Sequence, residues 1–388
     1  MTNSVSTGRE RVQEMLERAV AEMGVPGIVA EVHDDDGRWF GSAGVADIAT
    51  GRPRQEGEYL HVGSAGKAFT AAALLRLEAD GRLSIDDPVE KRLPGALNVN
   101  GYDGKRITIR HLLGNTGGLF PTGLAPELAR RYATRSAFDT HRLAAWTTDE
   151  LLELAVSQPP VHEPGTAFTY SNGGYHLAGL IIEKVTGSSY EEEVERTVIE
   201  PLGLRNTYVR PAEDTGYPEP HPRAYTGLFL KEGADPTDVT SENWPSMLED
   251  PGLPLLDTTE FNTSWVWAAG NVVSTTAEIT RAFQALTTGG LLPPAQHRAM
   301  WTMVPTEGGN WLPHSAYGLG VFGLDEAVTG GLPLRGMAGS VHGSHLFVVG
   351  TADGEQTITV HTNIECTSWD IIFRAVEARF GLPPVEGV

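Results

Sequence analysis

The stretch SAGKAFTAAALLRLEA, residues 64–79, places a Ser-x-x-Lys pair at the start of a segment that is apolar on almost every side. A segment of this length without a polar face predicts a central, buried helix. We expect Ser64 to cap its N-terminus and Gly81 to follow its end. On such a helix the Cβ atoms of Ser64 and Lys67 lie about 5–6 Å apart on one face, so the lysine amine can reach the serine hydroxyl.

Strand patterns occupy both ends of the chain around this helix. Near the N-terminus, a predicted helix over residues 10–23 is followed by a predicted hairpin of residues 28–33 and 38–45. The final third carries short apolar or β-branched runs before a last predicted helix over residues 369–380. These runs are residues 317–322, 334–338, 345–349 and 357–362.

The helical period dominates the middle of the chain, where one helix is expected to start at residue 172 or 173 and to end at residue 185. The whole pattern predicts an α+β fold, in which an antiparallel sheet is formed from both termini and flanked by helices, with an inserted, mostly helical lobe. We expect residues 1–80 and 265–388 to form the sheet domain and residues 81–264 to form the lobe. The active site is expected in the cleft between them, because binding sites favour such positions.

The composition limits the partners of the protein. The chain has 388 residues and a formal net charge of −21, and its apolar content of 40% excludes a disordered chain. The acidic balance argues against nucleic acid and membrane as partners, since both need clustered Lys and Arg. A single cysteine, Cys366, excludes an intrachain disulfide and is expected to be buried. Without a visible targeting segment or an apolar run of membrane-spanning length, the sequence predicts a soluble, cytoplasmic protein.

Ser64 and Lys67 are of the residue types that form a nucleophile and its general base. A serine hydroxyl is a poor nucleophile unless a neighbouring base removes its proton. A buried lysine can supply that base, because burial lowers the pKa of its amine. The alternative is structural, with Ser64 as an ordinary N-cap and Lys67 reaching back toward it.

A second polar group, Tyr170-Ser171-Asn172, stands where a loop enters an apolar helix. The Tyr170 phenol could pass a proton to a leaving group, and the Asn172 amide could hold a substrate carbonyl. The alternative is an asparagine N-cap beside a packed tyrosine. Tyr170 therefore joins Ser64 and Lys67 as a candidate catalytic residue, and Asn172 is a candidate substrate-binding residue.

In their order along the chain these motifs resemble the serine β-lactamase and penicillin-binding-protein family. The branch that the sequence resembles contains class C β-lactamases, DD-carboxypeptidases, D-aminopeptidases and β-lactamase-like esterases. Further matching segments extend the similarity from about residue 10 to about residue 380, and they include residues 107–113, 268–275 and 317–320. The resemblance implies a β-lactamase/transpeptidase-like fold, and an oxyanion hole made by the backbone N–H groups of Ser64 and Ser340.

The third motif of the family departs from its usual form. The segment 336–343 occupies its place, and Met337 stands where the family usually has Lys or His. Methionine can neither donate a hydrogen bond nor carry a positive charge, so it cannot hold a substrate carboxylate. Met337, Gly339 and Ser340 remain candidate substrate-binding residues on the strand that borders the site.

Three nearby side chains could replace the missing cation. Arg335 would share a strand face with Met337 and is a further candidate for substrate binding, although the pattern favours a solvated strand-end arginine. His342 and His345 lie just beyond and could approach the site or satisfy local hydrogen bonds.

These residues predict a serine acyl-transfer enzyme that works through an acyl-Ser64 intermediate, without a cofactor or a metal. We expect a small-molecule ester or amide as acyl donor, without a free carboxylate next to the scissile bond, and water or an amine as acceptor. An esterase or amidase and an amide-forming transacylase both fit this description. The alternatives are a DD-carboxypeptidase or β-lactamase-type hydrolase, and a catalytically inactive family member that binds a ligand or partner.

Overall fold

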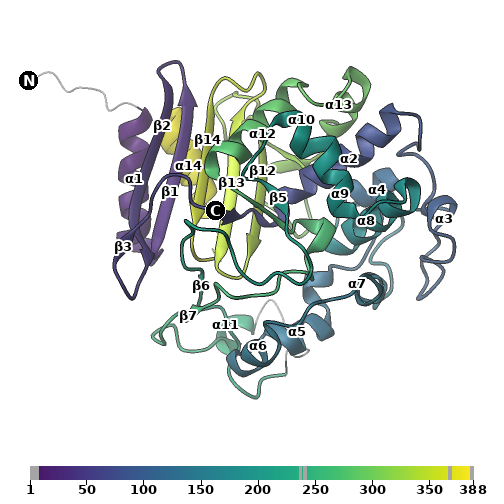
Figure 1. The fold of residues 1–388 in the computed structure, drawn as a ribbon, viewed down its shortest axis with the longest axis horizontal. Helices are drawn as coiled ribbons and strands as arrows, with labels where there is room; N and C mark the ends of the chain where they lie inside the picture. Colours follow the sequence, from purple (N-terminus) through teal and green to yellow (C-terminus); the bar gives the residue numbers. More distant parts are fainter. Residues whose placement is uncertain (1–7, 236–237, 239–242, 366–368, 385–388) are drawn as a thin grey trace, which may run out of the picture.

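One antiparallel sheet built from both ends of the chain organises the protein (Figure 1). The computed structural model describes residues 8–235, 238, 243–365 and 369–384. The strands of this nine-stranded sheet follow the order β3-β2-β1-β14-β13-β12-β11-β10-β9. Their bounds are β1 Gly27–Asp34, β2 Gly37–Asp47, β3 Arg52–Pro53, β9 Val304–Pro305, β10 Ser315–Tyr317, β11 Phe322–Leu324, β12 Leu334–Val341, β13 Ser344–Thr351 and β14 Thr357–Thr362. Because β1 pairs with β14, from Ile28 opposite Thr362 to His33 opposite Thr357, the expected α+β fold is confirmed.

Helices cover the two faces of this sheet. On one face lie α1 (Gly8–Met23) and α14 (Asp370–Phe380), whose apolar residues form one core with strand residues such as Ile28 and Val360. On the other face lie α2 (Lys67–Ala79) and α12 (Thr276–Thr288), which pack in a second core with Leu346 and Val348. The apolar α2 is buried along almost its whole length, as its lack of a polar face predicts.

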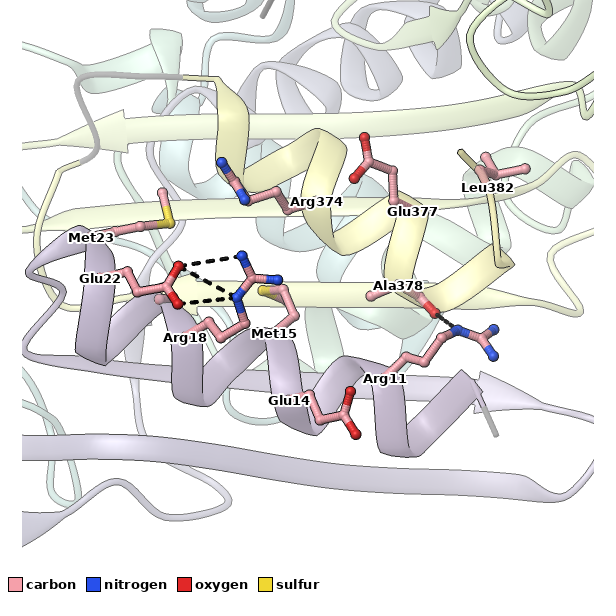
Figure 2. Close-up of a pocket in the computed structure, with 11 residues that line it drawn as sticks. Arg11, Glu14, Met15, Arg18, Glu22, Met23, Arg374, Glu377, Ala378 and Leu382 are labelled. Carbon is pink, nitrogen blue, oxygen red and sulfur yellow. Dashed lines mark hydrogen bonds and ion pairs between the residues drawn. The ribbon is translucent and has the colours of Figure 1, made fainter. Parts of the chain in front are cut away.

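A charged groove lies between α1 and α14, and Figure 2 shows it. The Arg18 and Glu22 side chains pair 3.3 Å apart within α1, and Arg11 donates to the Ala378 carbonyl oxygen at 2.9 Å. The groove encloses about 270 Å³ between helices that cover the sheet face opposite α2.

The remaining helices and short strands lie mostly in the middle of the chain. The helices are α3 Val89–Arg92, α4 Ile109–Leu113, α5 Pro126–Tyr132, α6 Arg135–His141, α7 Thr148–Ala155, α8 Asn172–Thr186, α9 Tyr190–Val194, α10 Glu200–Leu202, α11 Trp244–Met247 and α13 Pro294–Met300. The strands are β4 Leu60–His61, β5 Tyr208–Val209, β6 Tyr225–Thr226, β7 Leu256–Asp257 and β8 Val272–Ser274. Helices α3 to α11 fall within residues 81–264, and the limits of that expected lobe stay a prediction.

The structure corrects two local expectations. Ser64 does not cap α2, because it lies within a 3₁₀ turn, η1 (Gly63–Gly66), and its hydroxyl contacts Lys67 instead of a backbone N–H group. The strand expected over residues 317–322 is two strands, β10 and β11, joined by a tight turn at Gly320, which has a φ of +77°. Cys366 lies outside the described residues. Among the described residues, none of the helices has the length and apolarity that crossing a bilayer demands.

Candidate active site

The turn that carries Ser64 is held against the backbone of β12. Gly63 has a φ of +54°, and a Cβ atom there would lie 2.6 Å from the Ser340 nitrogen. A Cβ atom at Gly339 would lie 2.2 Å from both the Ser64 nitrogen and the Val62 oxygen. Only glycine permits so close an approach, so the two glycines bring the main chain of Ser340 against the turn.

The Lys67 amine contacts three oxygen atoms. Its Nζ lies 3.0 Å from Ser64 Oγ, 2.7 Å from Asn172 Oδ1 and 2.8 Å from the Ala269 carbonyl oxygen. The side chain is completely buried, and this burial lowers the pKa of the amine well below its usual value. The described residues place no carboxylate in contact with Nζ that would favour the charged form.

Lys67 Nζ is placed to donate to Ser64 Oγ while it is charged, and its contacts set the opposite direction for this hydrogen bond once the amine is neutral. A neutral amine has two N–H donors and one lone pair. Asn172 Oδ1 and the Ala269 oxygen can only accept, so they take both donors. The lone pair of Lys67 then accepts from the Ser64 hydroxyl, which is the arrangement that removes the serine proton.

Tyr170 lies over the same amine, with Lys67 Nζ 4.7 Å from the centre of its ring. The ring stacks on Trp311 at 4.6 Å, with an angle of 15° between the planes, and meets Tyr317 edge-on at 6.2 Å. Its hydroxyl is buried and has no partner in hydrogen-bonding geometry among the described residues. Burial raises the pKa of Tyr170 well above its usual value, Tyr317 adds to this rise, and the nearby Ser64 hydroxyl partly offsets it. The phenol therefore keeps its proton and can act as a donor.

Asn172 is the first residue of α8, and Ser171 rather than Asn172 caps that helix. Ser171 Oγ accepts from the Gly173 N–H at 3.2 Å and donates to the Phe120 carbonyl oxygen at 2.6 Å. These bonds fix the bend that turns both Tyr170 and Asn172 toward Lys67. Because the Asn172 amide oxygen accepts from Lys67, its amide nitrogen is the group that can donate to a substrate carbonyl.

The third-motif residues on β12 separate into two groups. Met337 is 1% exposed and packs in the core shared with α2, while Gly339 and Ser340 lie against the Ser64 turn. Arg335 is directed to α12, where it donates to the Thr287 carbonyl oxygen at 2.8 Å. Its guanidinium also lies 4.5 Å from the centre of the Trp301 ring. These contacts place Arg335 outside the Ser64 cluster, contrary to the expectation that it binds substrate.

The two histidines of this segment also lie among other residues. His342 packs against the rings of Tyr132, Phe138 and Phe261, and burial lowers its pKa to about 4. His345 is 3% exposed and contacts the rings of Phe347 and Trp369. Burial lowers the pKa of His345 to about 4 as well, so both imidazoles are neutral near pH 7 and neither supplies a cation.

Sequence reasoning missed a buried pair that supports the nucleophile turn. His61 Nδ1 accepts from the Gly63 N–H at 3.0 Å, and His61 Nε2 contacts Asn271 Oδ1 at 3.1 Å. The imidazole is neutral with its proton on Nε2, because burial, with a smaller effect of Arg210, lowers its pKa to about 3. Only its position three residues before Ser64 could have drawn attention to His61, since its partner is 210 residues away in the chain.

The comparisons with known proteins place nearly the whole chain in a family. Residues 12–364 match the family model described as Beta-lactamase. The chain therefore belongs to the beta-lactamase family.

Among solved structures, the chain is similar to a D-stereospecific amidohydrolase from Streptomyces sp.. The two are 34% identical with a TM-score of 0.81, and the match covers 95% of this chain and 98% of that one. The D-amino acid amidase from Ochrobactrum anthropi SV3, complexed with L-phenylalanine amide, shares the fold at 23% identity and a TM-score of 0.76, with coverage of 96% and 98%.

Curated relatives match over part of the chain. Penicillin-binding protein 4* of Bacillus subtilis (strain 168) is 28% identical over 52% of this chain and 42% of its own length. Protein flp of Staphylococcus aureus (strain MW2) is 32% identical over 53% of this chain and 37% of its own length. The chain thus matches less than half the length of these two relatives.

Proposed function

We propose that the protein is an amidase or esterase that forms an acyl-Ser64 intermediate from a substrate without a free carboxylate next to the scissile bond. Amides and esters of D-configured amino acids are the substrates that we favour. The contact between Ser64 Oγ and the buried Lys67 amine carries the proposal. The 34% identity to a protein described as a D-stereospecific amidohydrolase, over 95% of this chain, supports the choice of substrate.

In the acylation step, Lys67 takes the Ser64 proton while the serine oxygen forms a bond to the substrate carbonyl carbon. The backbone N–H groups of Ser64 and Ser340 donate to the oxygen that becomes negative. When the tetrahedral intermediate collapses, the bond to the leaving group breaks, and Tyr170 gives that group its proton. The phenol recovers a proton from the Lys67 ammonium, so both side chains end as they began.

In deacylation, water attacks the acyl-Ser64 ester and gives up one proton through the same groups, which regenerates the serine hydroxyl. An amine in place of water would form a new amide by the same steps, because its nitrogen attacks with a lone pair and then gives up one proton, as the water oxygen does. We propose both acceptors, with water as the one that is always present.

The side chains around β12 support the restriction on substrate. A carboxylate next to the scissile bond would need a cation, but Met337 is uncharged and Arg335 bonds to Thr287. An uncharged ester or amide can occupy this region without leaving a buried charge unpaired.

The test compares D-phenylalanine amide and methyl ester, their L-enantiomers, an N-acyl-D-Ala-D-Ala peptide and a penicillin as substrates. We expect faster turnover of the uncharged D-compounds, and a mass adduct on Ser64 with an activated ester. Ser64→Ala should abolish the adduct, and Tyr170→Phe should lower kcat about 10²- to 10⁴-fold, as expected for the loss of a general acid. Faster turnover of the penicillin or the peptide, or an adduct that survives in Ser64→Ala, would refute the proposal.

A further inference from the structure

The phenol of Tyr170 is not held in place by its own hydroxyl, which has no hydrogen-bond partner among the described residues. The main chain at Tyr170 also lies outside any helix or strand. An error of about 1 Å in the position of a catalytic group can cost about 10²-fold in rate. Contacts of the main chain and of the ring must therefore set the position of this side chain.

The side chain of Asn310 binds the main chain of Tyr170 with both of its polar atoms. The Tyr170 N–H donates to Asn310 Oδ1 at 2.7 Å, and Asn310 Nδ2 donates to the Tyr170 carbonyl oxygen at 3.2 Å. Because an N–H can only donate and a carbonyl oxygen can only accept, this pairing permits one orientation of the Asn310 amide. The amide takes the place of a neighbouring strand, which would bind the same two groups.

Asn115 binds the peptide groups on either side of Tyr170. Its main-chain oxygen accepts from the Thr169 N–H at 2.9 Å, and its Oδ1 accepts from the Ser171 N–H at 3.0 Å. Two asparagines from distant parts of the chain thus fix three successive N–H groups. With the main chain held in this way, only rotation about the side-chain bonds of Tyr170 can displace the phenol.

Trp311, the residue after Asn310, restricts that rotation. Its indole stacks on the Tyr170 ring at 4.6 Å, with an angle of 15° between the planes. On its other contacts the indole lies against Trp369, at 5.5 Å between ring centres, and against Phe322, at 6.3 Å. Stacking of this kind favours one plane for the Tyr170 ring. Two adjacent residues therefore hold the main chain and the ring of the same tyrosine.

The segment that carries both residues, 306–314, connects β9 to β10 and is itself tied down. At its ends, Thr306 Oγ1 donates to the Ser315 carbonyl oxygen at 2.7 Å, and Ser315 Oγ donates to the Leu312 carbonyl oxygen at 2.6 Å. A Cβ atom at Gly309 would lie 2.6 Å from Phe168 Cδ1 and 2.9 Å from the Phe168 oxygen, so glycine permits the close approach of the segment to residues 168–170.

We propose that Asn310 and Trp311 are positioning residues for the transfer of a proton from Tyr170 to the leaving group. This proposal rests on the proposed function, in which the Tyr170 hydroxyl gives its proton to the leaving group and recovers one from the Lys67 ammonium. Asn310 sets the place of the Tyr170 main chain, and Trp311 sets the plane of the ring. Loss of either contact lets the hydroxyl move away from the atoms between which it carries the proton.

The test varies the leaving group while the acyl group stays the same. The substrates are the p-nitrophenyl, phenyl and methyl esters of D-phenylalanine, whose leaving groups become more basic in that order. p-Nitrophenolate departs without a proton, whereas the leaving methoxide depends on a general acid. The measured quantity is the ratio of kcat/KM for the p-nitrophenyl ester to kcat/KM for the methyl ester, in which binding of the common acyl group cancels.

Tyr170→Phe gives the reference response, and we expect it to raise this ratio about 10²-fold. Asn310→Ala and Trp311→Leu should each raise the ratio about 10-fold, because the acid is displaced rather than removed. Trp311→Phe should restore most of the wild-type ratio, since a phenyl ring can still stack on Tyr170. If Trp311→Leu does not fold, Asn310→Ala still decides the matter, because Asn310 is an exposed residue.

Asn206→Ala is the matched control. Asn206 is exposed as Asn310 is, and its side chain also makes one bond as acceptor and one as donor. Its Oδ1 accepts from the Tyr59 hydroxyl at 2.9 Å, and its Nδ2 donates to Glu278 at 3.2 Å. Removal of these two bonds should leave the ratio of the two kcat/KM values unchanged.

An unchanged ratio in Asn310→Ala or in Trp311→Leu, together with a raised ratio in Tyr170→Phe, would overturn the positioning role of that residue and leave the acyl-Ser64 mechanism intact. An equal loss on all three esters would overturn it too, because the effect would then be on the fold as a whole. An unchanged ratio in Tyr170→Phe itself would show that Tyr170 is not the proton donor, and it would overturn both this proposal and that step of the proposed function.

Discussion

Replacement of Lys67 by Met tests whether the amine is uncharged in the folded protein. Burial lowers the pKa of Lys67 well below its usual value, whereas an unfolded chain has a lysine pKa of about 10.4. If the amine is neutral at pH 7 in the folded protein, folding releases a proton there, and 3.4 pH units at about 1.36 kcal/mol each correspond to about 4.6 kcal/mol. This free energy opposes folding of the wild type, and it is absent from Lys67→Met because methionine does not titrate.

The proton that Lys67 releases on folding also sets the sign of the pH dependence of the unfolding free energy. With a neutral Lys67 in the folded state, the unfolded state binds one proton more than the folded state at this position between pH 7 and pH 9, so the unfolding free energy rises by about 1.36 kcal/mol per pH unit. The unfolding free energy of Lys67→Met lacks this pH dependence, because methionine does not titrate. The unfolding free energy of the wild type should therefore rise by about 2.7 kcal/mol relative to that of Lys67→Met over these two pH units.

Urea unfolding of both proteins at pH 7, 8 and 9 measures this difference. The three contacts that Lys67→Met removes contribute equally at each pH, and so they cancel from the change. Lys184→Met, at an exposed position on α8, controls for the loss of a lysine from the surface. A wild-type advantage that stays constant from pH 7 to pH 9 would show that Lys67 is charged in the folded protein, which would refute its role as acceptor of the Ser64 proton.

Two further variants test the geometry of the nucleophile turn. Gly339→Ala should lower kcat/KM by at least about 10²-fold, because its Cβ atom would lie 2.2 Å from the Ser64 nitrogen; Gly216→Ala, where a Cβ atom is free, should retain full activity in the same assay. His61→Leu should lower the unfolding free energy by about 1–3 kcal/mol and slow acylation of Ser64, because it leaves the buried Gly63 N–H without an acceptor. If His61 positions the turn, His61→Gln should recover more of the acylation rate than of the unfolding free energy that His61→Leu loses. Equal recovery of the two quantities would indicate that His61 has a structural role alone.

The sequence predicted the elements whose signal is local. The apolar pattern of residues 10–23 gave α1 almost to the residue, and the runs at 334–338 and 357–362 located β12 and β14. The Ser-x-x-Lys spacing likewise anticipated the 3.0 Å contact of Ser64 with Lys67, since three residues of helix or 3₁₀ turn bring the two side chains to one face. The start of α2 was placed wrongly, because the hydroxyl of Ser64 serves the amine rather than the backbone.

Only the tertiary structure decided how the distant groups meet. The burial that lowers the pKa of Lys67 exists only in the folded chain, and its partners Asn172 and Ala269 lie 105 and 202 residues away. The side chain of Arg335 donates to the Thr287 carbonyl oxygen of α12. The strand pattern does not predict this partner, because it depends on which helix packs beside β12. Periodicity reports which face of an element is apolar, whereas the pKa and the partners of a buried polar group depend on chain segments brought together by folding.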